Sequence, residues 1–186
     1  PVINALTDLE HPCQALADFL TIKEEFHDFK DCVLTFIGDG NNVAHSLILC
    51  GALLGIEVRI ACPDKYLPNP SVIKKAREIY KNDSLLKITH DPYTAVTGAN
   101  VLYTDVWSSM GEENQKDEKD KDFAGFSIDS HLLKKANKDA IVLHCLPAYR
   151  NKEITNEVID CENSRIFEQA ENRLHAQQAL LALLLS

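Results

Sequence analysis

The sequence has few of the features that mark nucleic-acid-binding, membrane or secreted proteins. Of its 186 residues only 19 are lysine or arginine, against 28 aspartate and glutamate, which gives a formal charge of −9. This balance argues against a nucleic-acid partner and against an anionic membrane surface. We expect no signal peptide, and the one long apolar run, "ALLALLL" at 179–185, is too short to cross a bilayer.

The cysteines are scattered rather than clustered. There are six, at positions 13, 32, 50, 62, 145 and 161, with no C-x-x-C pair and no histidines at zinc-site spacing. This pattern predicts reduced thiols in a cytoplasmic protein, with no disulfide framework and no metal site. The length is that of one domain with a single core, and we treat 1–186 as one unit.

Apolar segments along the chain alternate between two periodicities. Runs without polar alternation, such as "CVLTFIGDG", are typical of strands buried on both faces of a parallel sheet. Between them lie segments with helical spacing, the first from Pro12 to Phe26 and the last from 168 to 185. The predicted strands are 33–37, 57–62, 85–90, 100–105 and 140–145, and the predicted intervening helices are 43–55, 69–81, 92–98 and 129–137. Such βα alternation predicts an α/β fold, a doubly wound Rossmann-like parallel sheet with helices on both faces.

One segment interrupts the alternation. "GEENQKDEKDKD" (111–122) is almost entirely polar, and its charge run predicts a solvated loop.

Polar residues follow three of the predicted strands. Doubly wound sheets bind ligands outside the carboxyl ends of their strands, at a topological switch point. Those ends carry "GDGNN" (38–42), "DVWSSM" (105–110) and "HCLP" (144–147). We therefore expect these three stretches to meet at one rim of the sheet and to form a ligand site.

"GDGNN" has two readings. It partly matches the dinucleotide fingerprint G-x-G-x-x-G/A, but Val43 stands where the third glycine belongs. The alternative is a tight strand-to-helix turn in which Asn41 or Asn42 caps the following helix.

Two other stretches have ordinary readings when taken alone. "HPCQ" places His11 and Gln14 on one face of a first helical turn, where they could simply be surface residues. Arg173 and Gln177 in "FEQAENRLHAQQ" could be an ordinary pair on a helix face. Likewise Asp105 could be a helix cap and Trp107 a core residue.

Taken together, these stretches resemble one family. "HPCQALADFLTI", "FIGDGNNVAHS", "DVWSSMG", "HCLPAYR" and "FEQAENRLHAQ" are similar to the second half of the ornithine carbamoyltransferases, and the resemblance runs from Pro1 to Ser186. The combination of D-x-W-x-S-M-G with H-C-L-P points to ornithine rather than to the related aspartate enzymes. Members of this family transfer the carbamoyl group of carbamoyl phosphate to the δ-amine of ornithine and release citrulline and phosphate, without a cofactor.

The resemblance also implies roles for individual residues. The ornithine-binding set is Asn42, Asp105, Ser109 and Met110, and the carbamoyl-phosphate-binding set is His11, Pro12, Cys13, Gln14, Cys145, Leu146 and Arg173. It implies that Cys145, Asp105, His11 and Arg173 take part in catalysis, with Cys145 meeting the δ-amine. A thiolate at Cys145 could help to deprotonate this amine, provided that nearby positive charge lowers the pKa of the thiol.

One element of the family pattern is absent from the sequence. The phosphate-binding S-T-R-T stretch of the family's first domain does not occur among these residues. We therefore expect an ornithine-binding domain separated from its carbamoyl-phosphate domain, inactive or nearly so on its own. Helices within 1–28 and 168–186 would pack toward that missing domain. The resemblance implies a homotrimer only for the full-length protein.

Three alternatives stay open at this point. The chain could be an amino-acid-binding module without catalysis, a nucleotide-dependent oxidoreductase that uses the "GDG" turn, or a carbamoyltransferase for another amine. Putrescine would not need Asp105 and Ser109 to hold an α-amino-acid group.

Overall fold

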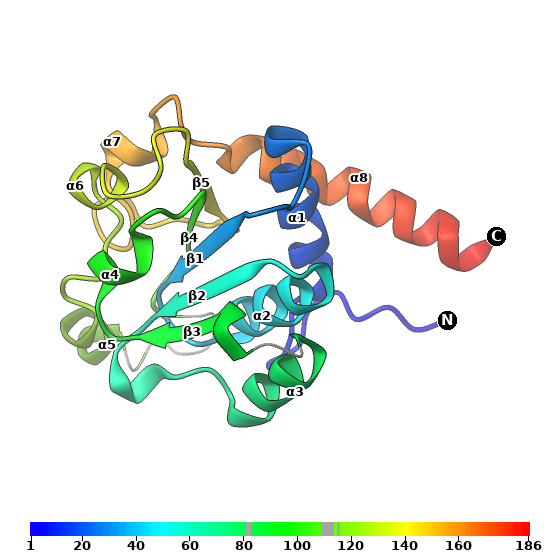
Figure 1. Cartoon of the computed structure of the whole chain (residues 1–186), viewed down its shortest axis with the longest axis horizontal. Coiled ribbons are helices and arrows are strands. Elements are labelled where there is room, and N and C mark those ends of the chain that lie inside the picture. Colours follow the sequence, from blue (N-terminus) through cyan, green and yellow to red (C-terminus); the bar gives the residue numbers. More distant parts are fainter. Residues whose placement is uncertain (81–82, 109–113, 115) are drawn as a thin grey trace.

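The described chain folds around one parallel β-sheet. The computed structural model describes residues 1–80, 83–108, 114 and 116–186 (Figure 1). Within them, five strands lie in the order β3-β2-β1-β4-β5, and all neighbours are parallel. The strands are β1 (Val33–Ile37), β2 (Glu57–Ala61), β3 (Leu86–Thr89), β4 (Val101–Thr104) and β5 (Ile141–His144). The predicted doubly wound parallel sheet is confirmed.

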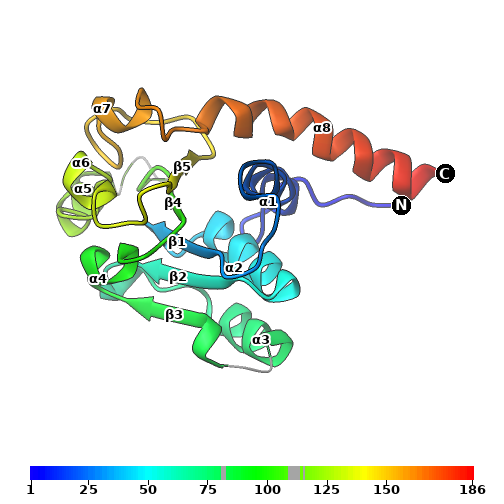
Figure 2. The same cartoon turned by 45° about the horizontal axis from the view of Figure 1, so that its top comes forward.

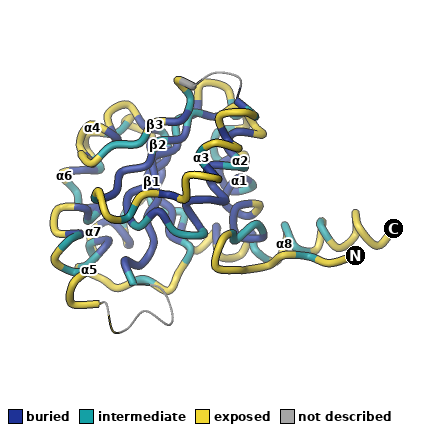
Figure 3. Tube along the Cα trace, turned by 90° about the horizontal axis from the view of Figure 1, so that it is seen from below, coloured by how far each residue is buried: buried dark blue, intermediate teal, exposed yellow. Residues whose placement is uncertain are grey.

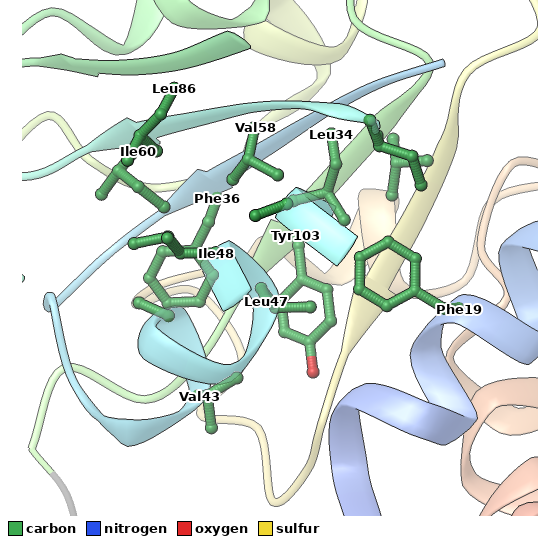
Figure 4. Close-up of a cluster of buried hydrophobic side chains, with 14 of the residues drawn as sticks. Phe19, Leu34, Phe36, Val43, Leu47, Ile48, Val58, Ile60, Leu86 and Tyr103 are labelled. Atoms are coloured by element: carbon green, nitrogen blue, oxygen red, sulfur yellow. The ribbon is translucent and has the colours of Figure 1, made fainter. Parts of the chain in front are cut away.

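Helices connect the strands and cover both faces of the sheet (Figure 2). They are α1 (Pro12–Phe26), α2 (Asn42–Leu54), α3 (Pro70–Tyr80), α4 (Pro92–Val96), α5 (Lys116–Asp122), α6 (Ser130–Leu133), α7 (Asn156–Ile159) and α8 (Ile166–Leu185), with short 3-10 turns η1 (Asp64–Tyr66) and η2 (Asp83–Leu85). One apolar cluster packs α1, α2 and α3 on one face, and a second packs α4, α6 and α7 on the other. Figure 4 shows the first cluster, in which Phe19, Leu34, Phe36 and Tyr103 are buried.

The helix ends follow from local chemistry. Pro12 opens α1, where its missing N–H costs nothing. Gly55 ends α2 in the left-handed conformation at φ 72°, and its N–H bonds to the carbonyl of Ala52. Both boundaries agree with the sequence prediction. The helical spacing predicted for 12–26 counts Leu16 among its apolar positions, but this residue is 41% exposed.

The prediction of a solvated loop at 111–122 is wrong for its second half. Residues Lys116–Asp122 form α5, and Lys119 is only 2% exposed. Lys119 Nζ lies 2.6 Å from Asp39 Oδ2, in the turn after β1. A charge run therefore folds here because one of its lysines has a partner far away in the sequence. Residues 111–113 and 115 lie outside the described part of the chain.

The two ends of the chain extend from the same side of the domain. The first part of α8 packs along α1, and the rest of α8 projects beyond the body of the domain beside the N-terminal segment (Figures 1 and 3). This projecting part carries exposed leucines at 174, 181, 183, 184 and 185. That these helices pack toward another domain stays a prediction. No helix in the described ranges is long and apolar enough to cross a membrane.

Candidate functional site

A thiol, a carboxylate and an amide meet where three strands end. Asp105 follows β4, Cys145 follows β5, and Asn41 lies in the turn after β1. The Sγ atom of Cys145 lies 3.1 Å from Asp105 Oδ1, and Asn41 Nδ2 donates to Asp105 Oδ2 at 2.9 Å. Asp105 is 7% exposed, while Cys145 and Asn41 are half-buried, so the cluster reaches the surface. The predicted convergence at one rim of the sheet is confirmed for these stretches.

The two asparagines of the turn have different partners. Asn41 is the N-cap of α2: its Oδ1 accepts from backbone N–H groups of the first helical turn, while its Nδ2 serves Asp105. Asn42, which we expected to bind ornithine, donates from Nδ2 to the carbonyl oxygen of Thr7 at 2.8 Å. In this structure, therefore, Asn41 completes the cluster around Asp105, and Asn42 holds the N-terminal segment.

The groups around Cys145 favour a protonated thiol and not the thiolate. Burial, the Asp105 carboxylate and the more distant Asp18 all raise the pKa of the thiol well above its usual value. A hydrogen bond from Tyr103 acts in the opposite direction and is the smallest of these effects. A thiolate at Cys145 was expected only with positive charge nearby, and none of the described groups that act on this thiol is a cation, so that expectation stays a prediction. Cys145 is a neutral thiol that donates to Asp105.

His144 has a structural role beside the thiol. It is 1% exposed, its Nδ1 accepts from the N–H of Leu146 at 2.9 Å, and its Nε2 lies 3.2 Å from Glu153 Oε1. Because Nδ1 accepts, the neutral ring carries its proton on Nε2 and donates it to Glu153. The histidine thus holds the turn that places Cys145. Leu146 within this turn has a φ of 58°, which is uncommon for a residue with a side chain.

Donor atoms of Asp105, His144 and Cys145 lie within 4.8 Å of one another, close enough to surround a cation. Both ring nitrogens of His144 already have hydrogen-bond partners in the described chain, so neither directs a lone pair toward the other two residues. We therefore assign no metal ion to this group.

Arg173 and Gln14 form a second part of the site. Arg173 on α8 donates from Nη1 to Gln14 Oε1 at 2.7 Å, and its Nε and Nη2 both donate to Gln177 Oε1, at 2.9 and 2.7 Å. The structure thus brings together two residues that are far apart in the sequence and that we predicted to surround the carbamoyl group. The guanidinium of Arg173 and the amide of Gln14 therefore meet near the N-terminal end of α1.

His11 lies at the start of α1, next to this pair. Its Nδ1 lies 2.6 Å from the carbonyl oxygen of Ala5, and its backbone N–H donates to Ser46 Oγ at 2.7 Å. Burial is the main influence on the imidazole and lowers its pKa, and the charges of Arg173 and Asp105 act on it with opposite signs. A neutral His11 that donates from Nδ1 presents an acceptor at Nε2.

The remaining predicted residues are less directly placed. Pro12 is the first residue of α1, and Cys13 is 2% exposed, with its sulfur 3.6 Å from the carbonyl oxygen of Asn4. The side chain of Cys13 therefore belongs to the interior. Ser109 and Met110 lie outside the described residues.

Sequence reasoning missed Asp18. This aspartate on α1 is fully buried and accepts hydrogen bonds from Gln14, Gln169 and Tyr103. Burial raises its pKa to about 7. The available signal was an acid on the apolar face of a helix, one turn after Gln14.

The loop that contains Leu67 and Pro68 packs directly on the "GDG" turn. Gly40 packs so closely on the next loop that an added Cβ would lie 2.3 Å from the backbone nitrogen of Pro68. Its N–H donates to the carbonyl oxygen of Tyr66 at 2.9 Å. A dinucleotide-binding turn instead keeps its glycine backbone open to a pyrophosphate. This packing argues against the oxidoreductase alternative.

Comparisons with known sequences agree with the predicted resemblance. Residues 30–184 match the family described as "Aspartate/ornithine carbamoyltransferase, Asp/Orn binding domain", and residues 1–24 match "Aspartate/ornithine carbamoyltransferase, carbamoyl-P binding domain". The chain is 80% identical over 186 residues to the ornithine carbamoyltransferase of Prochlorococcus marinus (strain MIT 9312), covering 100% of this chain and 60% of that protein. It is 58% identical over 185 residues to that of Parasynechococcus marenigrum (strain WH8102), covering 100% and 58%.

Solved structures agree as well. The ornithine carbamoyltransferase of Pyrococcus furiosus superimposes with a TM-score of 0.93 at 49% identity, over 98% of this chain and 59% of that one. The anabolic enzyme of Campylobacter jejuni superimposes with a TM-score of 0.92 at 42% identity, over 99% and 61%. The chain thus spans about 60% of the length of the curated relatives named above. On the match over residues 30–184, the chain belongs to the aspartate/ornithine carbamoyltransferase family, as its Asp/Orn-binding domain.

Proposed function

We propose that this chain is the ornithine-binding domain of an ornithine carbamoyltransferase. The whole protein would transfer the carbamoyl group of carbamoyl phosphate to the δ-amine of ornithine, giving citrulline and phosphate. The observation that carries the proposal is the contact of Cys145 with Asp105 at the rim of the sheet, 3.1 Å from sulfur to carboxylate oxygen. A carboxylate and a thiol side by side offer an acceptor and a donor to a diamino acid.

The acceptor substrate must lose a proton before it reacts, because ornithine's δ-amine is protonated near neutral pH and has no lone pair to attack with. Asp105 would attract an ammonium group of ornithine, and its other contacts hold the carboxylate in place. With an ammonium group beside Asp105, the charge that now raises the pKa of Cys145 would be offset. Cys145 would then act as a donor or acceptor that orients the δ-amine, as we infer by analogy with the family.

Arg173, Gln14 and His11 would surround the carbamoyl group. The attack forms a bond from the δ-nitrogen to the carbonyl carbon and breaks the bond from this carbon to the phosphate oxygen. The phosphate leaves with the electron pair and takes up the proton that the nitrogen loses. Negative charge develops on the carbonyl oxygen, and Arg173 is the cation available to stabilise it. A neutral His11 would accept from the carbamoyl NH₂ group, and a protonated His11 would donate to the carbonyl oxygen.

The proposal includes partners outside these residues. Phosphate would be held by a carbamoyl-phosphate-binding domain, and the match of residues 1–24 to that domain's family supports a junction near α1. A homotrimer of the full-length protein and a cytoplasmic location belong to the same proposal. We expect the 186-residue chain alone to bind ornithine weakly and to have negligible turnover.

Thiol protection tests the proposal. Trypsin releases Cys145 in the peptide 139–150, which contains no other cysteine, so its alkylation can be followed by mass spectrometry. Millimolar ornithine should slow the alkylation of Cys145, and putrescine, which lacks the α-carboxylate, should protect less. Equal protection by both amines would favour another acceptor substrate. Ornithine binding without any protection of Cys145 would favour the non-catalytic binding module.

A further inference from the structure

Asp18 is a fully buried carboxylate that joins both parts of the site. It lies on α1, one turn after Gln14. Its Oδ1 accepts from Gln14 Nε2 at 2.8 Å and from Gln169 Nε2 at 2.6 Å, and its Oδ2 accepts from the Tyr103 hydroxyl at 3.1 Å. These partners come from α1, α8 and β4, so one side chain links three elements that are distant in the sequence.

Asp18 fixes which way two glutamine amides point. Each glutamine gives its NH₂ group to Asp18 and therefore turns its oxygen outward. The oxygen of Gln14 accepts from Arg173 Nη1 at 2.7 Å, and that of Gln169 accepts from the backbone N–H of His144 at 2.8 Å. If either amide were reversed, a donor would face a donor. The orientation of Arg173 and the end of β5 thus both depend on one carboxylate.

Tyr103 connects Asp18 to the thiol. Its ring is packed among the apolar residues of the first core, with the hydroxyl oxygen pointing away from the ring cluster (Figure 4). This hydroxyl bonds to Asp18, and a hydrogen bond from it also favours the ionised form of Cys145. A tyrosine has one hydroxyl hydrogen, so it can donate to only one of these acceptors at a time.

We propose that Asp18 is a positioning residue for Cys145 and Arg173, which orients the two glutamine amides and determines whether the Tyr103 hydroxyl donates to the carboxylate or to the sulfur. The roles of Cys145 and Arg173 rest on the proposed function; the arrangement around Asp18 does not. An ionised Asp18 takes the hydroxyl hydrogen of Tyr103. A protonated Asp18 donates to Tyr103 instead and turns that hydrogen toward the sulfur.

The charges around Asp18 allow this change near neutral pH. Burial is the largest influence and raises the pKa of Asp18 to about 7, while the three hydrogen bonds and the charge of Arg173 oppose it. Within the described part of the chain, the charge of Asp18 raises the pKa of three other groups, which are Cys145 beside β5, Tyr103 on β4 and Cys50 on α2. Among the described residues, Arg173 on α8 is the cation whose charge acts on Asp18.

The test compares Cys145 alkylation by iodoacetamide in the 186-residue chain and in its Asp18→Asn variant, from pH 5.5 to 9 and without ornithine. Asparagine keeps an oxygen for the two glutamines and faces Tyr103 with an NH₂ group, which frees the tyrosine hydrogen for the sulfur. Cys62, buried in the core and recovered in the peptide 60–65, serves as an internal control for unfolding.

We expect the ratio of variant to wild-type rates to depend on pH. Below pH 6 the wild-type Asp18 is neutral, and the ratio should be near one. Above pH 8, removing the charge should lower the pKa of Cys145, and the rate should rise about three- to fourfold, because the gain in thiolate is partly offset by its lower nucleophilicity. A ratio that does not change with pH, with Cys62 still protected, would overturn the proposal.

Tyr103→Phe provides a second test, which decides the matter if Asp18→Asn exposes Cys62. It removes the hydroxyl and keeps the ring. Cys145 alkylation should slow about threefold below pH 7, where the hydroxyl serves the sulfur, and should change little above pH 8. Slowing by the same factor at every pH, or none, contradicts the proposal. Because ornithine is absent from both tests, failure of the thiol-protection experiment would leave these outcomes unaffected.

Discussion

Cys145 donates its thiol hydrogen to Asp105, with sulfur and carboxylate oxygen 3.1 Å apart. The contact joins the ends of two adjacent strands, since β4 and β5 pair in register up to Thr104 and His144. Each residue therefore affects the other: the carboxylate keeps the thiol protonated, and the thiol occupies one carboxylate oxygen. A substrate ammonium that approaches Asp105 would change both at once.

Replacing Asp105 by asparagine should separate these two effects. Ornithine should bind about 10- to 100-fold more weakly, because a hydrogen bond to a charged group contributes roughly 1.5–3 kcal/mol. In the same variant Cys145 should be alkylated faster, since the negative charge beside it is gone. Calorimetry measures the first effect and peptide mass spectrometry the second. The exposed Asp8→Asn is the matched control, and a variant that kept the affinity for ornithine would remove Asp105 from the binding site.

The pH dependence of stability should reveal Asp18. An exposed aspartate has a pKa of about 3.8, whereas burial raises the pKa of Asp18 in the folded chain to about 7. Because the folded state holds the proton more tightly, this aspartate's contribution to stability is fully present below about pH 3.8 and is lost as the pH rises through 7. The Asp18→Asn variant should therefore gain stability relative to wild type across this window, by roughly 2–4 kcal/mol. Urea unfolding at pH 5, 7 and 8.5 measures the difference, and a difference independent of pH would contradict it.

Local signals predicted most of the fold. The apolar runs at 33–37 and 141–144 contain no alternation, which is typical of a strand buried on both faces. Proline and glycine then marked the ends of α1 and α2. The short α7, which was not predicted, spans only Asn156–Ile159. A helix of one turn gains its stability from its neighbours rather than from its own sequence, so periodicity cannot identify it.

The site was predictable in position but not in electrostatics. Parallel strands bring their carboxyl ends to one edge, so Asp105 and Cys145 had to lie near each other. Whether the thiol would meet a cation or an anion depends on side-chain distances of a few ångströms, and no sequence pattern gives these. For the same reason the sequence could not separate Asn41 from Asn42, which are adjacent but point to Asp105 and to Thr7.

The contact of Gly40 with the next loop should be sensitive to one methyl group. In Gly40→Ala the new Cβ would lie 2.3 Å from the nitrogen of Pro68 and 2.5 Å from the carbonyl carbon of Leu67. Backbone cannot yield as a side chain can, so we expect a loss of about 3 kcal/mol. Gly55→Ala is the control: its Cβ would meet nothing within 4 Å, and the cost of about 1 kcal/mol comes from the left-handed backbone alone. Urea unfolding followed by Trp107 fluorescence measures both, and equal losses would show that the Gly40 contact can relax.

The pair of Lys119 and Asp39 should stabilise the domain more than an exposed pair does. The two side chains are 3% and 15% exposed, and their charged atoms lie 2.6 Å apart. Lys119→Met leaves a carboxylate in a mostly buried place, and we expect a loss of about 3 kcal/mol, whereas the double variant Lys119→Met/Asp39→Asn should recover about 1–2 kcal/mol of it. Lys65, whose amine lies 3.0 Å from Asp122 but is 63% exposed, is the matched control. Its replacement by methionine should barely change the urea midpoint, because solvent and salt screen an exposed pair. If the Lys119 variant were as stable as the Lys65 variant at both low and high salt, α5 would be held by its apolar contacts and not by its pairing with the turn after β1.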